Sequence, residues 1–397
     1  MSVRGKNRLK AFQASGDQTT GALGPATMTA QSASAVPPPT AGTSSRGGAL
    51  DLLRFSAAML IMLYHFGNES PIKLYHLNPV FSRGYIATDF FLILSGYVLG
   101  RAYGPAIQNA TMGWGRFWVR RASRVWPAHL IVMAAFGVYV FVQMTWFGVP
   151  ANPARFAWSA FVQQALLIHA WSPINPPADG WNLPSWSLSA LLFCYAAFPW
   201  AWKALVRVRP AAVLVMIGLA AIVAGDSTAR ALYDRPLYDL PFQLGVVRGV
   251  PLFLLGMCLA QAVALDWPSK RAARILMWGG LVVFFGLAGS GRFDFLTMAA
   301  IAAVILGAGR LPVKKPVALF ETAARLSFAL FITHTLVGVL YWDPIHLLIS
   351  KVPIGIGFQW AMWVAGFPLA ILCAFAFDKW IDQPIQDFIQ PYLKTKK

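Results

Sequence analysis

Apolar stretches separated by short polar or charged connections recur along the chain from residue 49 to residue 378. Most reach about 18 residues, which is enough for a helix to cross a hydrocarbon core about 30 Å thick. The pattern predicts an all-α polytopic membrane protein. The stretches cover 49–66, 84–103, 126–148, 155–170, 186–206, 211–225, 246–264, 274–289, 294–309, 326–343 and 356–378.

The fourth stretch, 155–170, differs from the others because it is short and contains Arg155, Gln163, Gln164 and His169. If it lies at the outer surface instead of crossing, most of the 33 Lys and Arg residues fall on the cytoplasmic side, as the positive-inside rule requires. We therefore expect about ten transmembrane helices around a polar channel. The protein should lie in the inner membrane of a bacterial cell. Both of its termini should lie in the cytoplasm.

Composition supports this class, since 57% of residues are hydrophobic and only 12% are charged, against roughly 25% in soluble domains. In a membrane protein the net charge of +18 indicates topology and contact with membrane lipid, not nucleic-acid binding. The three cysteines lie in apolar stretches without metal-ligand or disulfide spacing, so no metal is expected.

The chain is expected to divide into three parts. Residues 1–48 are rich in Ala, Ser, Thr, Gly and Pro and should form a disordered cytoplasmic tail. Residues 49–390 should form one membrane domain, and 391–397 a basic cytoplasmic tail. The external segment 149–185 is the longest loop and a candidate lid or acceptor surface.

Ionisable residues inside spans cost several kcal/mol unless they face a cavity or a partner, so each is a functional candidate. Arg54 and His65 are 11 positions apart and share one face of the first span. Asp89 begins the second span at the depth of His65 and is expected to orient its imidazole, although a helix N-terminus alone favours a carboxylate. Ser327 and His334 share a face, and His334 should line the pore near mid-depth.

A basic element, RFWVRRASRVWPAH, follows the second span and contains Arg120, Arg121 and Arg124. Guanidinium groups on one helical face suit phosphate binding, whereas a topology anchor on anionic lipid is the plain alternative. At the other end of the chain, Pro384 is expected to stop the last helix. Asp382 should lie at the cytoplasmic mouth.

Seven motifs in this order resemble the membrane acyltransferase type 3 family over about residues 49–390. They are Arg54 with His65, DFFLILSG from Asp89, RRASRVWP from Arg120, WSLS from Trp186, RGVPLFLLG from Arg248, LSFALFITH ending at His334, and DQP from Asp382. One departure is Leu191, which follows WSLS and Ala190 where the family usually has Glu.

The resemblance implies O-acylation, usually acetylation, of an extracytoplasmic carbohydrate with cytoplasmic acyl-CoA as donor substrate and no permanently bound cofactor. Glycan-synthesis machinery is the partner this activity suggests. The catalytic candidates are His65, Arg54 and Asp89, and the donor-binding candidates are Arg120, Arg121 and Arg124. The channel or acceptor candidates are Ser95, Trp186, Ser187, Ser189, Arg248, Ser327 and His334.

Two chemical routes and one rival function stay open at this point. His65 can act as general base on the acceptor hydroxyl, or it can carry the acyl group as a covalent intermediate. Embedded Arg, Asp and His also occur in proton-coupled secondary transporters. Such transporters commonly contain internal repeats, and the sequence has no such self-similarity.

Overall fold

The computed structural model describes residues 47–148, 156–174 and 180–393, and this part of the chain is helical with no β-strand. It belongs to one compact unit, residues 41–397. The tail predicted for residues 1–48 falls almost entirely outside the described residues. So do parts of the external segment 149–185.

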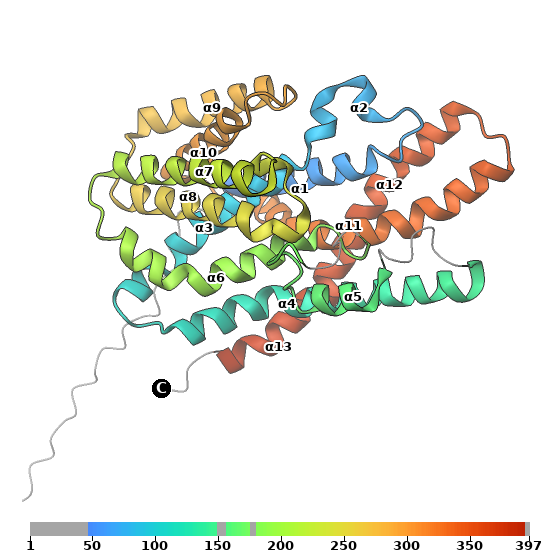
Figure 1. The fold of residues 1–397 in the computed structure, drawn as a ribbon, viewed down its shortest axis with the longest axis horizontal. Coiled ribbons are helices and arrows are strands. Elements are labelled where there is room, and N and C mark those ends of the chain that lie inside the picture. The colour runs from blue at the N-terminus through green and yellow to red at the C-terminus, as the bar shows by residue number, and fades with distance from the viewer. Residues whose placement is uncertain (1–46, 149–155, 175–179, 394–397) are drawn as a thin grey trace, which may run out of the picture. The chain divides into compact units, whose positions relative to one another are not determined.

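Most of the long helices run in nearly the same direction, which is horizontal in Figure 1. This arrangement, and the absence of strands from the described residues, confirm the predicted all-α polytopic class. In chain order the longer elements are α1 (Ala49–Phe66), α3 (Ile86–Gln108), α4 (Trp114–Val142), α6 (Ser185–Leu205), α7 (Ala211–Tyr233), α8 (Gly245–Ala264), α9 (Lys270–Leu287), α10 (Asp294–Arg310), α11 (Ala318–Lys351), α12 (Ile356–Phe377) and α13 (Gln383–Leu393). The shorter ones are α2 (Leu74–Leu77), η1 (Pro79–Arg83), η2 (Gln143–Phe147), α5 (Trp158–Ala165), η4 (Leu237–Asp239), η5 (Phe242–Leu244) and η6 (Asp378–Asp382).

Eight helical runs among the described residues are long and apolar enough to cross a membrane. They contain α1, α3, α4, α6, α7, α8, α11 and α12. Helices α9 and α10, with 18 and 17 residues, match two more predicted spans but lie at the short end of spanning length. The total of ten spans stays a prediction. Helix α5 has eight residues, about 12 Å of helix, so the fourth apolar stretch is too short to cross.

Helices α3 and α8 pack with their backbones in close contact. A Cβ atom added to Gly96 would lie 2.0 Å from the carbonyl oxygen of Phe253, and one added to Gly256 would lie 1.9 Å from that of Ile93. Small residues allow this approach between membrane helices, where van der Waals packing replaces the hydrophobic effect. The two glycines thus fix the spacing of the helices that carry Asp89 and Arg248.

Several helix ends differ from the prediction. Helix α4 begins at Trp114, so the basic element lies inside a long helix and not in a connecting loop before it. The expectation that Pro384 ends the last helix is wrong. The π-helical turn η6 follows α12 directly and leads into α13, so the helical run continues through Pro384.

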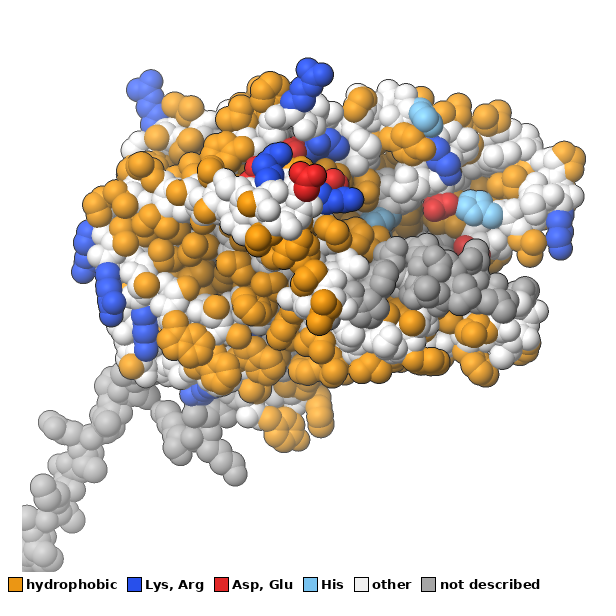
Figure 2. Space-filling view, in the orientation of Figure 1, with side chains coloured by type: hydrophobic (Ala, Val, Ile, Leu, Met, Phe, Trp, Pro, Cys, Tyr) orange, Lys and Arg blue, Asp and Glu red, His pale blue; other side chains and the backbone are white. Residues whose placement is uncertain are grey.

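Large apolar side chains cover much of the molecular surface (Figure 2). On α9 and α12, for example, Val282 is 74% exposed and Leu372 is 64% exposed. Water would disfavour such surfaces, whereas hydrocarbon chains accept them. Lipid contact explains why α7, α9 and α12 bury few of their residues inside the protein.

Candidate active site

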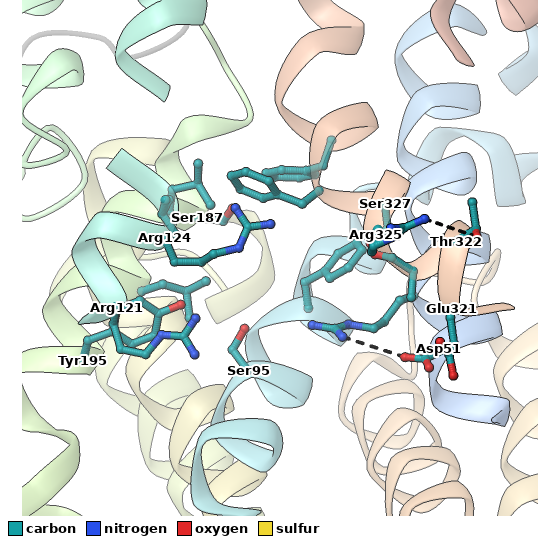
Figure 3. A pocket seen from close by; sticks show the side chains of 18 of the residues that line it. Asp51, Ser95, Arg121, Arg124, Ser187, Tyr195, Glu321, Thr322, Arg325 and Ser327 are labelled. Carbon is teal, nitrogen blue, oxygen red and sulfur yellow. Dashed lines mark hydrogen bonds and ion pairs between the residues drawn. The ribbon is translucent and has the colours of Figure 1, made fainter. Parts of the chain in front are cut away.

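A cavity of about 790 Å³ lies among α1, α3, α4, α6 and α11. We call it the arginine cavity. Its charged lining residues are Asp51, Arg54, Arg121, Arg124, Glu321 and Arg325. Figure 3 shows Arg121 and Arg124 projecting from one side towards Ser95, with Asp51 and Glu321 on the opposite side. Four guanidinium groups against two carboxylates give the lining a positive balance.

The arginines of this cavity differ in how they are neutralised. Arg124 donates to the buried carboxylate of Asp382 at 2.9 Å, and Arg54 lies 3.9 Å from Asp51. Arg121 has no carboxylate partner in the described part of the chain and lies over the ring of Tyr195, 5.9 Å from its centroid. Its charge is therefore available to an anionic ligand.

The structure brings two of the three donor-binding candidates together with three of the channel or acceptor candidates. Arg121, Arg124, Ser95, Ser187 and Ser327 all line the cavity. Arg120 does not line it, because adjacent residues on a helix point about 100° apart.

A second cavity, of about 600 Å³, lies at the opposite ends of α1, α4 and α11. We call it the histidine cavity. Its polar lining residues are His65, Asn68, Glu69, Tyr139, Gln143, Thr335, Asp343 and His346, and the apolar ones include Trp181 and Trp342. In Figure 2, acidic and histidine side chains gather in a hollow on the side where α11 and α12 meet.

His65 and His334 lie where the two cavities approach each other. On α11, Phe331 lines the arginine cavity and Thr335 lines the histidine cavity, with His334 in the same turn. The ring centroids of His65 and His334 are 5.1 Å apart. His334 does not line the pore as expected, because it is fully buried against His65 and lines neither cavity. His65 faces the histidine cavity instead.

Hydrogen bonds define the tautomer of His334. Its Nδ1 lies 3.0 Å from the carbonyl oxygens of both Leu330 and Phe331 and must donate to them, because carbonyl oxygens only accept. The Nε2 atom of the neutral ring is then an acceptor, and it is buried without a partner in the described residues. The His65 ring makes no hydrogen bond within those residues, so its nitrogen atoms are available to a ligand.

Asp89 does not reach His65 as expected. Both of its carboxylate oxygens accept from Arg248, at 2.8 and 2.7 Å, and both side chains are buried. Arg248 also donates to the Tyr238 carbonyl oxygen and lies over the Trp186 ring. The carboxylate neutralises a buried guanidinium on α8, a partner that the spacing within the second span could not indicate.

A smaller cavity of about 190 Å³ reaches His65 from another side. Trp186, Tyr85, Tyr238 and Arg248 line it, and Trp186, one of the channel or acceptor candidates, is buried. Ser189 lines none of the three cavities described here. Its hydroxyl donates to the Leu167 carbonyl oxygen and accepts from the Ala170 N–H, which ties the preceding loop to α6.

The sequence analysis missed a polar network beside His334. Asn182 donates to the Ile332 carbonyl oxygen, accepts from the Thr335 hydroxyl and donates its backbone N–H to Gln164. It thereby joins the described end of the external segment to α11 on both sides of His334. The sequence did indicate that segment 149–185 is a candidate acceptor surface. No residue spacing within it distinguished Asn182 from its neighbours.

A second polar pair lies in the same external segment. Burial, together with a smaller effect of the neighbouring His129, lowers the pKa of His169 to about 3. The neutral imidazole lies 3.3 Å from the Ser185 hydroxyl at the first residue of α6. This pair anchors the start of the WSLS helix and takes no part in lining the histidine cavity.

The fold and these cavities define a polytopic membrane protein in which one helix bundle joins a basic cavity at one end to an acidic, histidine-lined cavity at the other. Comparison with known families identifies the group. A family model described as an acyltransferase domain matches residues 48–379. The chain belongs to this acyltransferase family, as the motifs from Arg54 to Asp382 had indicated.

Two curated relatives are similar to parts of the chain. Acyltransferase MdmB of Streptomyces mycarofaciens is 31% identical over 165 residues, which are 40% of this chain and 39% of the relative. Protein 2 in the picA locus of Rhizobium radiobacter is 32% identical over 101 residues, 25% of this chain and 49% of the relative. The chain thus matches less than half the length of each. No solved structure matches it.

Proposed function

We propose that this protein is an integral membrane O-acyltransferase that moves an acyl group, by preference acetyl, from acyl-CoA to a hydroxyl group of an extracytoplasmic carbohydrate. One observation carries the proposal. A basic cavity and a histidine-lined cavity lie at opposite ends of the same three helices, α1, α4 and α11, with His65 between them. A donor and an acceptor can therefore approach one imidazole from opposite sides.

The arginine cavity suits the donor. Coenzyme A carries several phosphate groups, and guanidinium groups bind phosphate through charge-assisted hydrogen bonds. Arg121 would bind them with its unneutralised charge, and Tyr195 beneath it offers an aromatic face. The thioester arm would pass Arg54 and Phe331 towards His65, a distance of about 16 Å along α1. In this assignment the arginine cavity opens to the cytoplasm of the inner membrane.

The reaction follows from the protonation state of the two imidazoles. A neutral His65 accepts the proton of the acceptor hydroxyl as its oxygen attacks the thioester carbonyl carbon. The carbon–sulfur bond then breaks, and the leaving thiolate of coenzyme A takes the proton from His65, which restores the neutral imidazole. His334 would orient His65 through the packing of the two rings. The alternative of an acyl group carried by His65 uses the same residues and remains open to test.

The test compares two histidine variants of the purified protein in lipid nanodiscs. His65→Ala should lower the rate of acyl transfer from acetyl-CoA by about 10² to 10⁴, the usual contribution of a general base. His76→Ala is the matched control, because His76 is an exposed histidine on α2 outside the cavities, and it should keep the full rate. Thermal melts of both variants check folding.

Full transfer activity in His65→Ala would contradict the assignment. In that case ion and solute flux through liposomes decides the rival function, a proton-coupled transporter. Acid quenching during turnover, followed by mass analysis of the His65 peptide, separates the two chemical routes, since only the covalent route adds an acyl mass to His65.

A further inference from the structure

The two cavities differ in charge as well as in position. In the histidine cavity, the described lining residues include the carboxylates of Glu69 and Asp343 and no Lys or Arg. The arginine cavity has four Arg against two carboxylates. The two ends of the helix bundle therefore present opposite charge to a ligand.

The two carboxylates are held in place by side chains other than lysine and arginine. Asp343 accepts a hydrogen bond from the Tyr139 hydroxyl, which in turn accepts from the Gln143 side chain at 3.1 Å. Glu69 lies 3.3 Å from Nε2 of His346. No lysine or arginine forms an ion pair with Glu69 or Asp343 among the described residues. Lys73 donates to the Asn68 carbonyl oxygen nearby but does not line the cavity.

We propose that the histidine cavity selects an acceptor whose reacting unit is polyhydroxylated and either uncharged or cationic, and that Glu69 and Asp343 reject units bearing a carboxylate, sulfate or phosphate. This inference rests on the proposed function. Carboxylate and amide oxygens accept hydrogen bonds from hydroxyl and ammonium groups. The same oxygens repel an anion.

The charge of the cavity can be measured without knowledge of the acceptor. A cysteine introduced by Val339→Cys on α11 would line the cavity. Its rates of reaction with cationic and anionic methanethiosulfonates of similar size report the local potential. Leu77→Cys on α2, which is 59% exposed, provides the reference. We expect the ratio of cationic to anionic rates to exceed that at the reference by at least tenfold.

Removal of the two carboxylates tests their role. Glu69→Gln with Asp343→Asn should bring the ratio at position 339 to within about threefold of the reference. Asp234→Asn is the matched control, since it removes an exposed carboxylate outside the cavity at a left-handed residue, a conformation that Asn tolerates. It should leave the ratio unchanged. Equal rates in the parent, or a ratio that the double variant does not lower, would overturn the inference whatever the transfer assay gives.

Acceptor choice is then measured with methyl glucoside, its 2-amino analogue and methyl glucuronide as probes, at equal concentrations with acetyl-CoA. The glucoside and the amino sugar should be acylated at least tenfold faster than the glucuronide, and the double variant should reduce this difference. Faster acylation of the glucuronide would overturn the inference while leaving the proposed acyltransferase function intact. A His65→Ala protein with full activity would instead overturn the function.

Discussion

Arg121 and Arg120 are neighbours in sequence with different surroundings. Arg121 lines the arginine cavity without a carboxylate partner, whereas Arg120 does not line it. From charge alone, either residue can bind the phosphate groups of a donor or the head groups of anionic lipid. Only the rotation of α4 relative to α3 and α6 separates them, which makes the pair a test of donor binding.

Arg121→Ala should raise the KM for acyl-CoA by about tenfold to a hundredfold, the loss of one charge-assisted contact, with little change in kcat. Added salt should reproduce part of the effect in the parent protein through screening. Steady-state thioester consumption measures both constants. Arg120→Ala should keep the parent KM; an equal increase in both variants would favour lipid anchoring over donor binding.

At the scale of elements, the contact between α3 and α8 fixes the relative position of several site residues. Ser95 of the arginine cavity precedes Gly96, and Arg248 lies two turns before Gly256 on α8. Both glycines contact the backbone of the facing helix and not a movable side chain. A larger residue at either position therefore has to move a whole helix.

Gly96→Ala should destabilise the protein by about 1–3 kcal/mol, the usual cost of overpacking, and lower its melting temperature in detergent. Gly279→Ala on α9 is the control, because a Cβ there meets nothing within 4 Å. Alanine also favours helix over glycine, so this variant should melt at the parent temperature or slightly above. Equal melting of the two variants would contradict the close α3–α8 contact.

At the scale of the whole molecule, the proposed function places the donor and the acceptor on opposite sides of the membrane. Residue 172 precedes α6, and residue 208 follows it. The basic residues Lys203, Arg207 and Arg209 lie beside residue 208. Positive charge favours the cytoplasmic side. The 21-residue α6 is long enough to separate the two positions.

A topology reporter inserted near residue 208 should therefore report the cytoplasm, and one near residue 172 the outer side. Labelling of intact and permeabilised cells with an impermeant thiol reagent, after cysteine insertion at the same positions, provides an independent measurement. The reverse pattern would place the arginine cavity on the outer side and exclude cytoplasmic acyl-CoA as its ligand.

The sequence by itself determined the class of this protein. Helix-length apolar stretches have few physical solutions other than membrane helices, and α1 places Arg54 and His65 on one face by helical periodicity alone. The motifs also identified the family, and the family model confirms it. These features depend on local sequence or on the order of motifs along the chain, so no tertiary contact was needed to find them.

Only the tertiary structure decided which residues meet. Asp89 pairs with Arg248 from a helix 159 residues further on, and His334 packs against His65 from the far end of the chain. Arg120 lies outside the site because of the rotation of its helix, and Ser189 because its hydroxyl anchors a loop. Glu69 and Asp343, which the sequence analysis did not name, line the histidine cavity. Periodicity places a residue on a face of its own helix, but the neighbour of that face is set by packing among helices distant in sequence.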